Sequence, residues 1–148
     1  DIVGNFGRAN RFDYTAMGDS MNIAARLEAA NKHFGTRVAV SEASLSRAFP
    51  GPARDDLSLD DATILPIGNV ILKGKKQPVT VYTCLKDLDT TLAANYRNAY
   101  VAMQDDMARA VALLTAINEG EAVHPLAALH LRRLDAGETG ATFELLEK

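Results

Sequence analysis

The spacing of apolar residues changes several times along the chain and predicts an alternation of strands and helices. Residues 3–6 and 12–17 are short segments that mix apolar, aromatic and β-branched side chains, which predicts a strand in each. From Asp19 the apolar positions recur every three or four residues, at Ile23, Ala24, Leu27, Ala30 and Phe34. This period predicts an amphipathic helix that is capped by Asp19 or Ser20 and ends at Gly35.

Strand patterns dominate the middle of the chain. Apolar and β-branched side chains in residues 36–40 predict one strand, and those in residues 64–67, 70–72 and 79–85 predict two or three more. A short helix that starts at Ser41 and Glu42 separates the first two segments, and a polar turn over residues 73–78 joins the last two. Residues 54–61 are acidic and polar, which predicts a surface loop. This order predicts a mixed α/β domain with an open sheet.

The period becomes helical again after residue 87. Apolar residues follow at intervals of three or four, which predicts one long amphipathic helix or two helices with a nearby break: Leu92, Tyr96, Ala99, Met103, Met107, Ala110, Leu114 and Ile117. Gly120 is expected to end this part, followed by a helix over residues 125–134 and a short strand over 142–146. We therefore predict an α/β part in residues 1–86 and a helical hairpin extension in residues 87–148.

Composition narrows the possible classes of protein. The 148 residues are enough for one domain with a real core, and the net charge of −3 gives no field that would draw the chain to nucleic acid. The single cysteine, Cys84, excludes an intrachain disulfide and fits the cytoplasm. No apolar run reaches the roughly 18 residues of a spanning helix, so a membrane link is expected only through segments upstream of this sequence. No signal peptide is recognisable.

A pair of polar residues on the first predicted helix is suited to binding an anion. Asn22 and Arg26 are four residues apart, so on a helix they share one face, which is not the apolar face. The donors of a guanidinium form a planar fork that matches phosphate oxygens. The same spacing is also common on solvated helix faces, so the pattern alone leaves both interpretations open.

The predicted hairpin turn carries a second candidate phosphate site. Lys73, Lys75 and Lys76 bring three ammonium groups to a turn in which Gly74 lets the backbone bend tightly. The alternative is a solvated tip, because lysines often protect the edge of a sheet from pairing with another chain. The spacing from Gly68 to Gly74 does not fit a P-loop.

The remaining reactive side chains predict no further site. The histidines His33, His124 and His130 lack the spacing of metal ligands and are expected at the surface or in the core. Cys84 lies in an apolar run and is interpreted as a small buried side chain. The adjacent aspartate pairs point in different directions on a strand or a helix, so no metal site is predicted within this sequence.

Two longer motifs carry a family resemblance. The run Gly-Asn-Phe-Gly at residues 4–7 and the run RFDYTAMGDSMNIAARLE at residues 11–28 resemble the class III adenylate and guanylate cyclase catalytic domain of bacterial type. Residues 35–42 and 65–82 resemble the next strand and the closing hairpin of that domain, so the resemblance covers about residues 3–86. It implies a ferredoxin-like nucleotide cyclase fold whose N-terminal part lies upstream, followed here by a helical tail.

The resemblance also implies an activity and roles for four residues. The activity is adenylate cyclase chemistry, the conversion of ATP to 3′,5′-cyclic AMP and pyrophosphate in intracellular signalling. Asn22 is expected to orient the ribose, and Arg26 to stabilise charge that develops on the phosphates. Lys73 is expected to contact the terminal phosphates. Thr15 stands where the family places a residue that reads the purine.

Other components of such a site are expected outside this sequence. In the family, two aspartates that bind Mg²⁺ or Mn²⁺ and a purine-reading lysine precede the segment seen here, and a second cyclase domain, in a homodimer, completes the active site. We therefore expect this chain to be inactive alone. The alternatives are a non-catalytic dimerisation or regulatory module derived from a cyclase, guanylate cyclase chemistry, or an unrelated phosphate-binding α/β protein.

Overall fold

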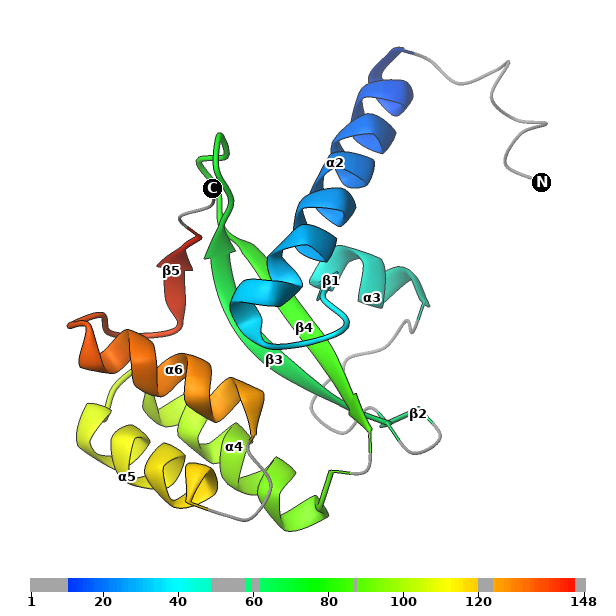
Figure 1. Cartoon of the computed structure of the whole chain (residues 1–148). Helices are drawn as coiled ribbons and strands as arrows, with labels where there is room; N and C mark the ends of the chain where they lie inside the picture. Colours follow the sequence, from blue (N-terminus) through cyan, green and yellow to red (C-terminus); the bar gives the residue numbers. More distant parts are fainter. Residues whose placement is uncertain (1–10, 49–57, 60–61, 87, 120–123, 146–148) are drawn as a thin grey trace.

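The computed structural model describes residues 11–48, 58–59, 62–86, 88–119 and 124–145. These residues form a mixed α/β structure, as the sequence predicts (Figure 1). The helices are α2 (Arg11–Phe34), α3 (Glu42–Ala48), α4 (Thr90–Ala102), α5 (Met107–Asn118) and α6 (Pro125–Asp135). The strands are β1 (Val40–Ser41), β2 (Ser58–Leu59), β3 (Ala62–Ile71), β4 (Val79–Lys86) and β5 (Thr142–Glu144).

The sheet is built around the long antiparallel hairpin of β3 and β4. The strand order is β1-β4-β3-β2, and β5 pairs in parallel with β3 on the same side as β2. Residues 64–67 and 70–72 belong to one strand, which agrees with the predicted alternative of two strands over residues 64–85, because β3 passes through an irregularity between Pro66 and Gly68 instead of ending there. The predicted final strand is confirmed as β5.

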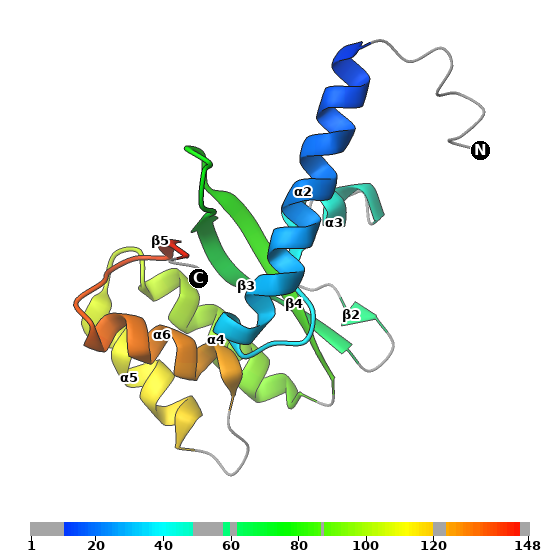
Figure 2. The same ribbon diagram turned by 45° about the horizontal axis from the view of Figure 1, so that its top comes forward.

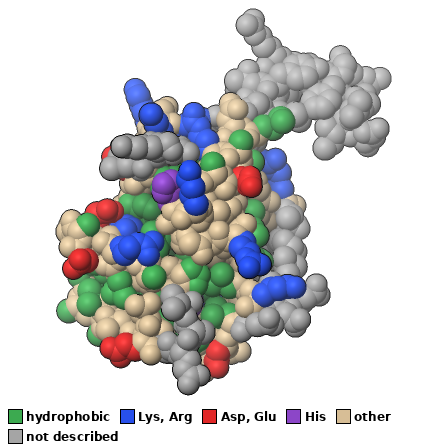
Figure 3. Space-filling view, viewed as in Figure 1, with side chains coloured by type: hydrophobic (Ala, Val, Ile, Leu, Met, Phe, Trp, Pro, Cys, Tyr) green, Lys and Arg blue, Asp and Glu red, His purple; other side chains and the backbone are tan. Residues whose placement is uncertain are grey.

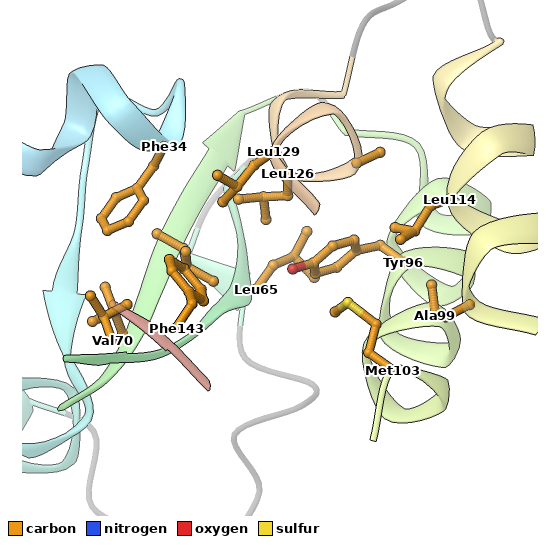
Figure 4. Close-up of a cluster of buried hydrophobic side chains, with 14 of the residues drawn as sticks. Phe34, Leu65, Val70, Tyr96, Ala99, Met103, Leu114, Leu126, Leu129 and Phe143 are labelled. Carbon is orange, nitrogen blue, oxygen red and sulfur yellow. The ribbon is translucent and has the colours of Figure 1, made fainter. Parts of the chain in front are cut away.

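The helices cover the sheet in two groups. Helices α4, α5 and α6 lie together beside β3, while α2 crosses the hairpin and projects beyond the rest of the fold (Figure 1, Figure 2). Phe34 of α2, Val70 of β3 and Phe143 of β5 lie at one end of the core, and Tyr96, Met103 and Leu114 lie at the other (Figure 4). One continuous cluster of buried side chains therefore joins α2, the sheet and the C-terminal helices. The division at residue 86 stays a prediction.

The beginning of α2 corrects two expectations. The predicted strand over residues 12–17 is wrong, because these residues form the first turns of α2. Asp19 and Ser20 lie inside this helix and do not cap it. A helix satisfies its backbone hydrogen bonds within itself, whereas a strand needs a neighbouring strand. In the described sheet β1 pairs only with β4, so residues 12–17 have no strand partner there. The predicted strand over residues 3–6 lies outside the described residues.

The end of α2 follows the predicted signal. Gly35 has a φ of 75° and donates its N–H to the Asn31 carbonyl at 2.9 Å, so it ends the helix in the left-handed conformation. The Thr36 hydroxyl also donates to the Asn31 side chain, at 2.7 Å. This contact keeps Thr36 with the helix end, and the predicted strand over residues 36–40 shortens to β1. Helix α3 starts at Glu42, as predicted, and Ser41 caps it, because the Ser41 Oγ accepts from the Ser44 N–H at 3.1 Å.

The helical segment after residue 87 is broken, as one of the two predicted alternatives requires. Helix α4 ends at Ala102, and the Asp106 side chain caps α5 by accepting from the Arg109 N–H at 3.1 Å. Helix α6 starts at Pro125, as the sequence predicts.

The predicted stop at Gly120 lies outside the described residues. Most of the predicted loop over residues 54–61 lies outside them too, and its described part forms β2. No helix among the described residues combines the length and apolarity needed to cross a membrane.

The contact between β5 and β3 depends on the absence of a side chain at Gly68. A Cβ at this position would lie 2.6 Å from Phe143 Cε1 and 2.8 Å from the Ala141 carbonyl oxygen, closer than real Cβ contacts. The neighbouring Asn69 N–H donates to that same carbonyl at 2.8 Å.

We expect Gly68→Ala to lower the free energy of unfolding by about 1–3 kcal/mol, because the added methyl group must displace the Phe143 ring and the β5 backbone. Chemical denaturation followed by circular dichroism measures this. Ala116→Ser on the exposed face of α5 is a control that should change the value by less than about 0.5 kcal/mol. Equal values for the two variants would show that β5 does not pack on β3.

Candidate functional site

The two candidate phosphate-binding segments meet in the fold. The Nη1 group of Arg26 on α2 donates a hydrogen bond to the backbone carbonyl of Lys73 in the β3–β4 turn, across 47 positions of sequence. Lysine and arginine side chains gather on the surface over this part of the molecule (Figure 3). The sequence patterns predicted each segment separately, and the family resemblance assigned both to one nucleotide. The direct contact between Arg26 and the Lys73 carbonyl is seen only in the structure.

The packing of α2 fixes where Arg26 lies. Leu27, Ala30 and Phe34 are almost completely buried and lie on one stripe of the helix, as the period predicts. Arg26 precedes Leu27 and is half-buried at the edge of this stripe, beside the turn. Ala24 was predicted on the apolar stripe but is exposed. The guanidinium is therefore held by the same packing that holds the helix.

The turn that accepts this hydrogen bond is tight and well defined. The Lys75 N–H donates to the Leu72 carbonyl at 2.9 Å, which closes a four-residue β-turn. Gly74, the third residue of the turn, has a φ of 84°. Leu72 is buried, whereas the Lys73 side chain is exposed. The turn therefore anchors its first residue in the core and presents the Lys73 ammonium to solvent.

The other two predicted residues lie on the same helix as Arg26. Asn22 is exposed, and it stands one turn before Arg26 on the same face of α2. Thr15 lies within α2, about two turns before Asn22, but its side chain lies outside those that the structure describes. The structure therefore brings Arg26 and Lys73 together, with Asn22 nearby on the helix.

The electrostatics of this site favour an anion. Arg26 forms no ion pair with a carboxylate among the side chains that the structure describes, and its hydrogen bond to Lys73 goes to a neutral carbonyl. Those carboxylates therefore leave the positive charges of the Arg26 guanidinium and the Lys73 ammonium uncompensated. A half-buried guanidinium that contacts the backbone of an exposed lysine can act together with it to bind and neutralise a phosphate group.

The rest of the described structure offers no stronger candidate for a metal or a nucleophile. Within the described ranges, no three side chains of histidine, cysteine, aspartate or glutamate lie close enough to hold a metal ion. Burial raises the pKa of the Cys84 thiol, so it is a poor nucleophile. A cavity of about 490 Å³ beside α4 is lined by side chains that include Tyr82, Arg97 and Tyr100, and none of the predicted site residues borders it.

Comparison with known proteins relates part of the chain to adenylate cyclases. It is 35% identical over 81 residues to adenylate cyclase 1 of Rhizobium meliloti (strain 1021). It is 30% identical over 81 residues both to the terminal-differentiation-specific adenylate cyclase of Dictyostelium discoideum and to an adenylate cyclase of Anabaena cylindrica. Each match covers 55% of this chain, but only 11%, 4% and 15% of these relatives, respectively. No family model and no solved structure matches.

The chain therefore contains a region related to adenylate cyclases. It spans only a small part of the length of the relatives that it matches. Their names describe complete proteins, so the reaction, its substrate and its partners require a separate argument for this chain.

Proposed function

We propose that residues 1–86 are the C-terminal part of a class III nucleotide cyclase catalytic domain of bacterial type, with a ferredoxin-like fold. The complete protein would convert ATP to 3′,5′-cyclic AMP and pyrophosphate in intracellular signalling. The observation that carries this proposal is the contact between Arg26 and the Lys73 turn. It joins two phosphate-binding candidates in a chain of which 81 residues match an adenylate cyclase.

Each predicted residue has a role in this reaction. The ribose 3′-hydroxyl loses its proton to water, its oxygen forms a new bond to the α-phosphorus, and the bond from that phosphorus to the bridging oxygen breaks, so that pyrophosphate leaves. Negative charge grows on the phosphoryl oxygens during this step. The Arg26 guanidinium stabilises that charge, and the Lys73 ammonium binds the terminal phosphates. Asn22 orients the ribose, and Thr15 contributes to reading adenine.

The divalent ions of the proposed reaction, Mg²⁺ or Mn²⁺, require ligands beyond those described. The described residues contain no cluster of side chains that fits such an ion. Asp19 lies within α2 in the motif that also holds Asn22, so we assign it no metal. We propose that these ligands lie upstream of this sequence.

A second cyclase domain is the proposed partner of the site. Asn22 and Lys73 are exposed, so a nucleotide bound to Arg26 would face solvent on one side. A cyclase domain from a second copy would cover that side, exclude water and complete the purine site. We propose a homodimer on this basis, and we propose that the isolated chain makes no cyclic AMP. We also propose that the protein acts in the cytoplasm.

The test is a cyclase assay on the protein with its upstream sequence included, using ATP and GTP with Mn²⁺. We expect cyclic AMP from ATP, and we expect Arg26→Ala to lower kcat about 10²-fold, because a charge-stabilising donor is lost in the transition state. Arg37→Ala is the matched control, because Arg37 is an exposed arginine just beyond the end of α2.

Three results would contradict parts of the proposal. Cyclic GMP as the main product would change the substrate. No product from either nucleotide, from a folded protein, would indicate a cyclase-derived module that has kept only a binding or dimerisation role. Equal kcat values for Arg26→Ala and Arg37→Ala would remove Arg26 from the reaction.

A further inference from the structure

The hydrogen bond between Arg26 and Lys73 depends on the conformation of a single peptide in the turn. The turn runs from Leu72 to Lys75 and is closed by their backbone hydrogen bond of 2.9 Å. A positive φ at its third residue, Gly74, is typical of a type II turn. The alternative with positive φ, type I′, would require Lys73 also to adopt a left-handed conformation, which a lysine rarely does.

The type of turn decides where the Lys73 carbonyl points. Type I and type II turns have similar ends but differ by a rotation of about 180° of the peptide between their second and third residues. That peptide carries the Lys73 carbonyl oxygen, which accepts from Arg26. In a type I turn this oxygen would point away from α2, and the guanidinium would lose its acceptor.

The space around Gly74 is large enough for a side chain, so a substitution there would act through the backbone conformation and not through a steric clash. A Cβ at Gly74 would lie 3.8 Å from Arg26 Nη1 and 3.9 Å from Nη2, which is ordinary van der Waals contact. A methyl group therefore fits beside the guanidinium. A residue with a side chain would disfavour only the positive φ, and it could relieve that strain by returning the turn to type I.

We propose that Gly74 is a positioning residue: its left-handed backbone aims the Lys73 carbonyl at Arg26 and so fixes the guanidinium against the turn that carries Lys73. The effect of Gly74 on catalysis rests on the proposed function. If that function holds, one peptide sets the separation of the two cations that bind phosphate. The position of the guanidinium itself does not depend on the reaction.

The primary test is NMR of the arginine side chains in this chain, labelled with ¹⁵N. Loss of one signal in Arg26→Lys identifies the Arg26 Nε–H. In the wild type we expect slow rotation of the Arg26 guanidinium, because Nη1 is bonded to the Lys73 carbonyl. Gly74→Ala should shift the Nε–H signal and at least double the rotation rate. Gly74→Asn should restore both values, because asparagine tolerates a positive φ.

Gly137→Ala is the matched control for backbone strain. Gly137 has a φ of 91°, and a Cβ there would meet no atom within 4 Å, so the substitution brings similar strain far from α2. Both alanine variants should lower Tm by about 2–4 °C, which confirms that they fold. Only Gly74→Ala should change the Arg26 signal. An unchanged Arg26 signal in Gly74→Ala, or the same change in Gly137→Ala, would overturn the proposal.

A second arm connects the turn to catalysis in the complete protein. We expect Gly74→Ala to lower kcat about tenfold with KM changed less than about twofold, and Gly74→Asn to recover most of kcat. If the wild type makes no cyclic nucleotide, the proposed function fails, while the NMR result still decides the role of Gly74. If the wild type is active and Gly74→Ala matches it in kcat, the catalytic consequence is wrong.

Discussion

Replacing Tyr96 by alanine is expected to lower the free energy of unfolding by about 3–5 kcal/mol. Tyr96 lies on α4, is completely buried, and its ring faces the centre of the core (Figure 4). It stacks on His124 with ring centroids 5.2 Å apart, and its hydroxyl donates to the Pro66 carbonyl at 2.5 Å. One side chain thus connects α4 to the start of α6 and to β3, and its removal leaves a cavity between them.

Urea unfolding followed by circular dichroism measures this effect, with Tyr96→Phe as the matched control. Phenylalanine keeps the ring and its packing but loses the hydrogen bond, so we expect a loss of about 1 kcal/mol. A loss below about 1.5 kcal/mol for Tyr96→Ala would show that the C-terminal helices do not pack on the sheet through this residue. The expected loss is a large fraction of the 5–15 kcal/mol that is typical of a folded domain.

Acid is expected to destabilise the C-terminal helices through two buried histidines. His124 caps α6, because its Nδ1 accepts from the Leu126 N–H at 3.2 Å and the Ala127 N–H at 3.4 Å. The Nδ1 of His130 lies 2.8 Å from Arg133 Nη1, which can only donate. In both rings Nδ1 must therefore be an unprotonated acceptor, and protonation would break these contacts.

The surroundings of both rings oppose the charged form. Burial lowers the pKa of His124 to about 4. Burial and then the neighbouring Arg133 charge lower the pKa of His130 to about 3. Arg133 itself is buried and is held by Glu138 at 3.1 Å and by the Gly140 carbonyl at 3.0 Å, so its charge stays close to His130.

The direction of the pH effect follows from these depressed pKa values. In the unfolded chain each imidazole has a pKa near 6.5, so between about pH 6.5 and pH 4 the unfolded state binds more protons than the folded state. The stabilisation is fully present above pH 6.5 and is lost as the pH falls towards the folded pKa values. Over this range each histidine should lower the free energy of unfolding by about 1.4 kcal/mol for each unit by which the pH falls.

The measurement is the free energy of unfolding between pH 7 and pH 4.5, compared with His124→Asn. Asparagine caps a helix without titrating in this range, so the variant should lose about half of the histidine contribution to the pH slope. His33→Gln is the control, because it removes the third histidine and touches neither buried contact. If His124→Asn and the wild type have the same slope, protonation of His124 is not coupled to unfolding.

Part of the candidate site could be predicted from the sequence because its determinants are local. Asn22 and Arg26 share a helix face through their spacing alone, and this helix occurs. Lys73 and Gly74 were recognised as parts of a turn from their residue types. The contact of Arg26 with the Lys73 carbonyl joins residues that are 47 positions apart, and no period in the sequence carries that information.

The sequence by itself determined the elements whose signals lie within one or two turns of chain. The period of three and four predicted the helical segment that forms α4 and α5, and Gly35 placed the end of α2 through its left-handed conformation. The strand patterns placed the β3–β4 hairpin. In each case a short stretch holds both the residues and the physical reason, such as an apolar stripe or a backbone that only glycine readily adopts.

Only the tertiary structure decided where pairing and packing override local preference. The strand pattern of residues 12–17 became helix, because a strand needs a neighbouring strand for its hydrogen bonds and a helix does not. Conversely, β3 continues past Pro66 because β4 pairs with both of its halves. The parallel contact of β5 with β3, and the meeting of Arg26 with the turn, arise when one core brings distant segments together. Such contacts depend on the free energy of the whole fold, which no short window of sequence contains.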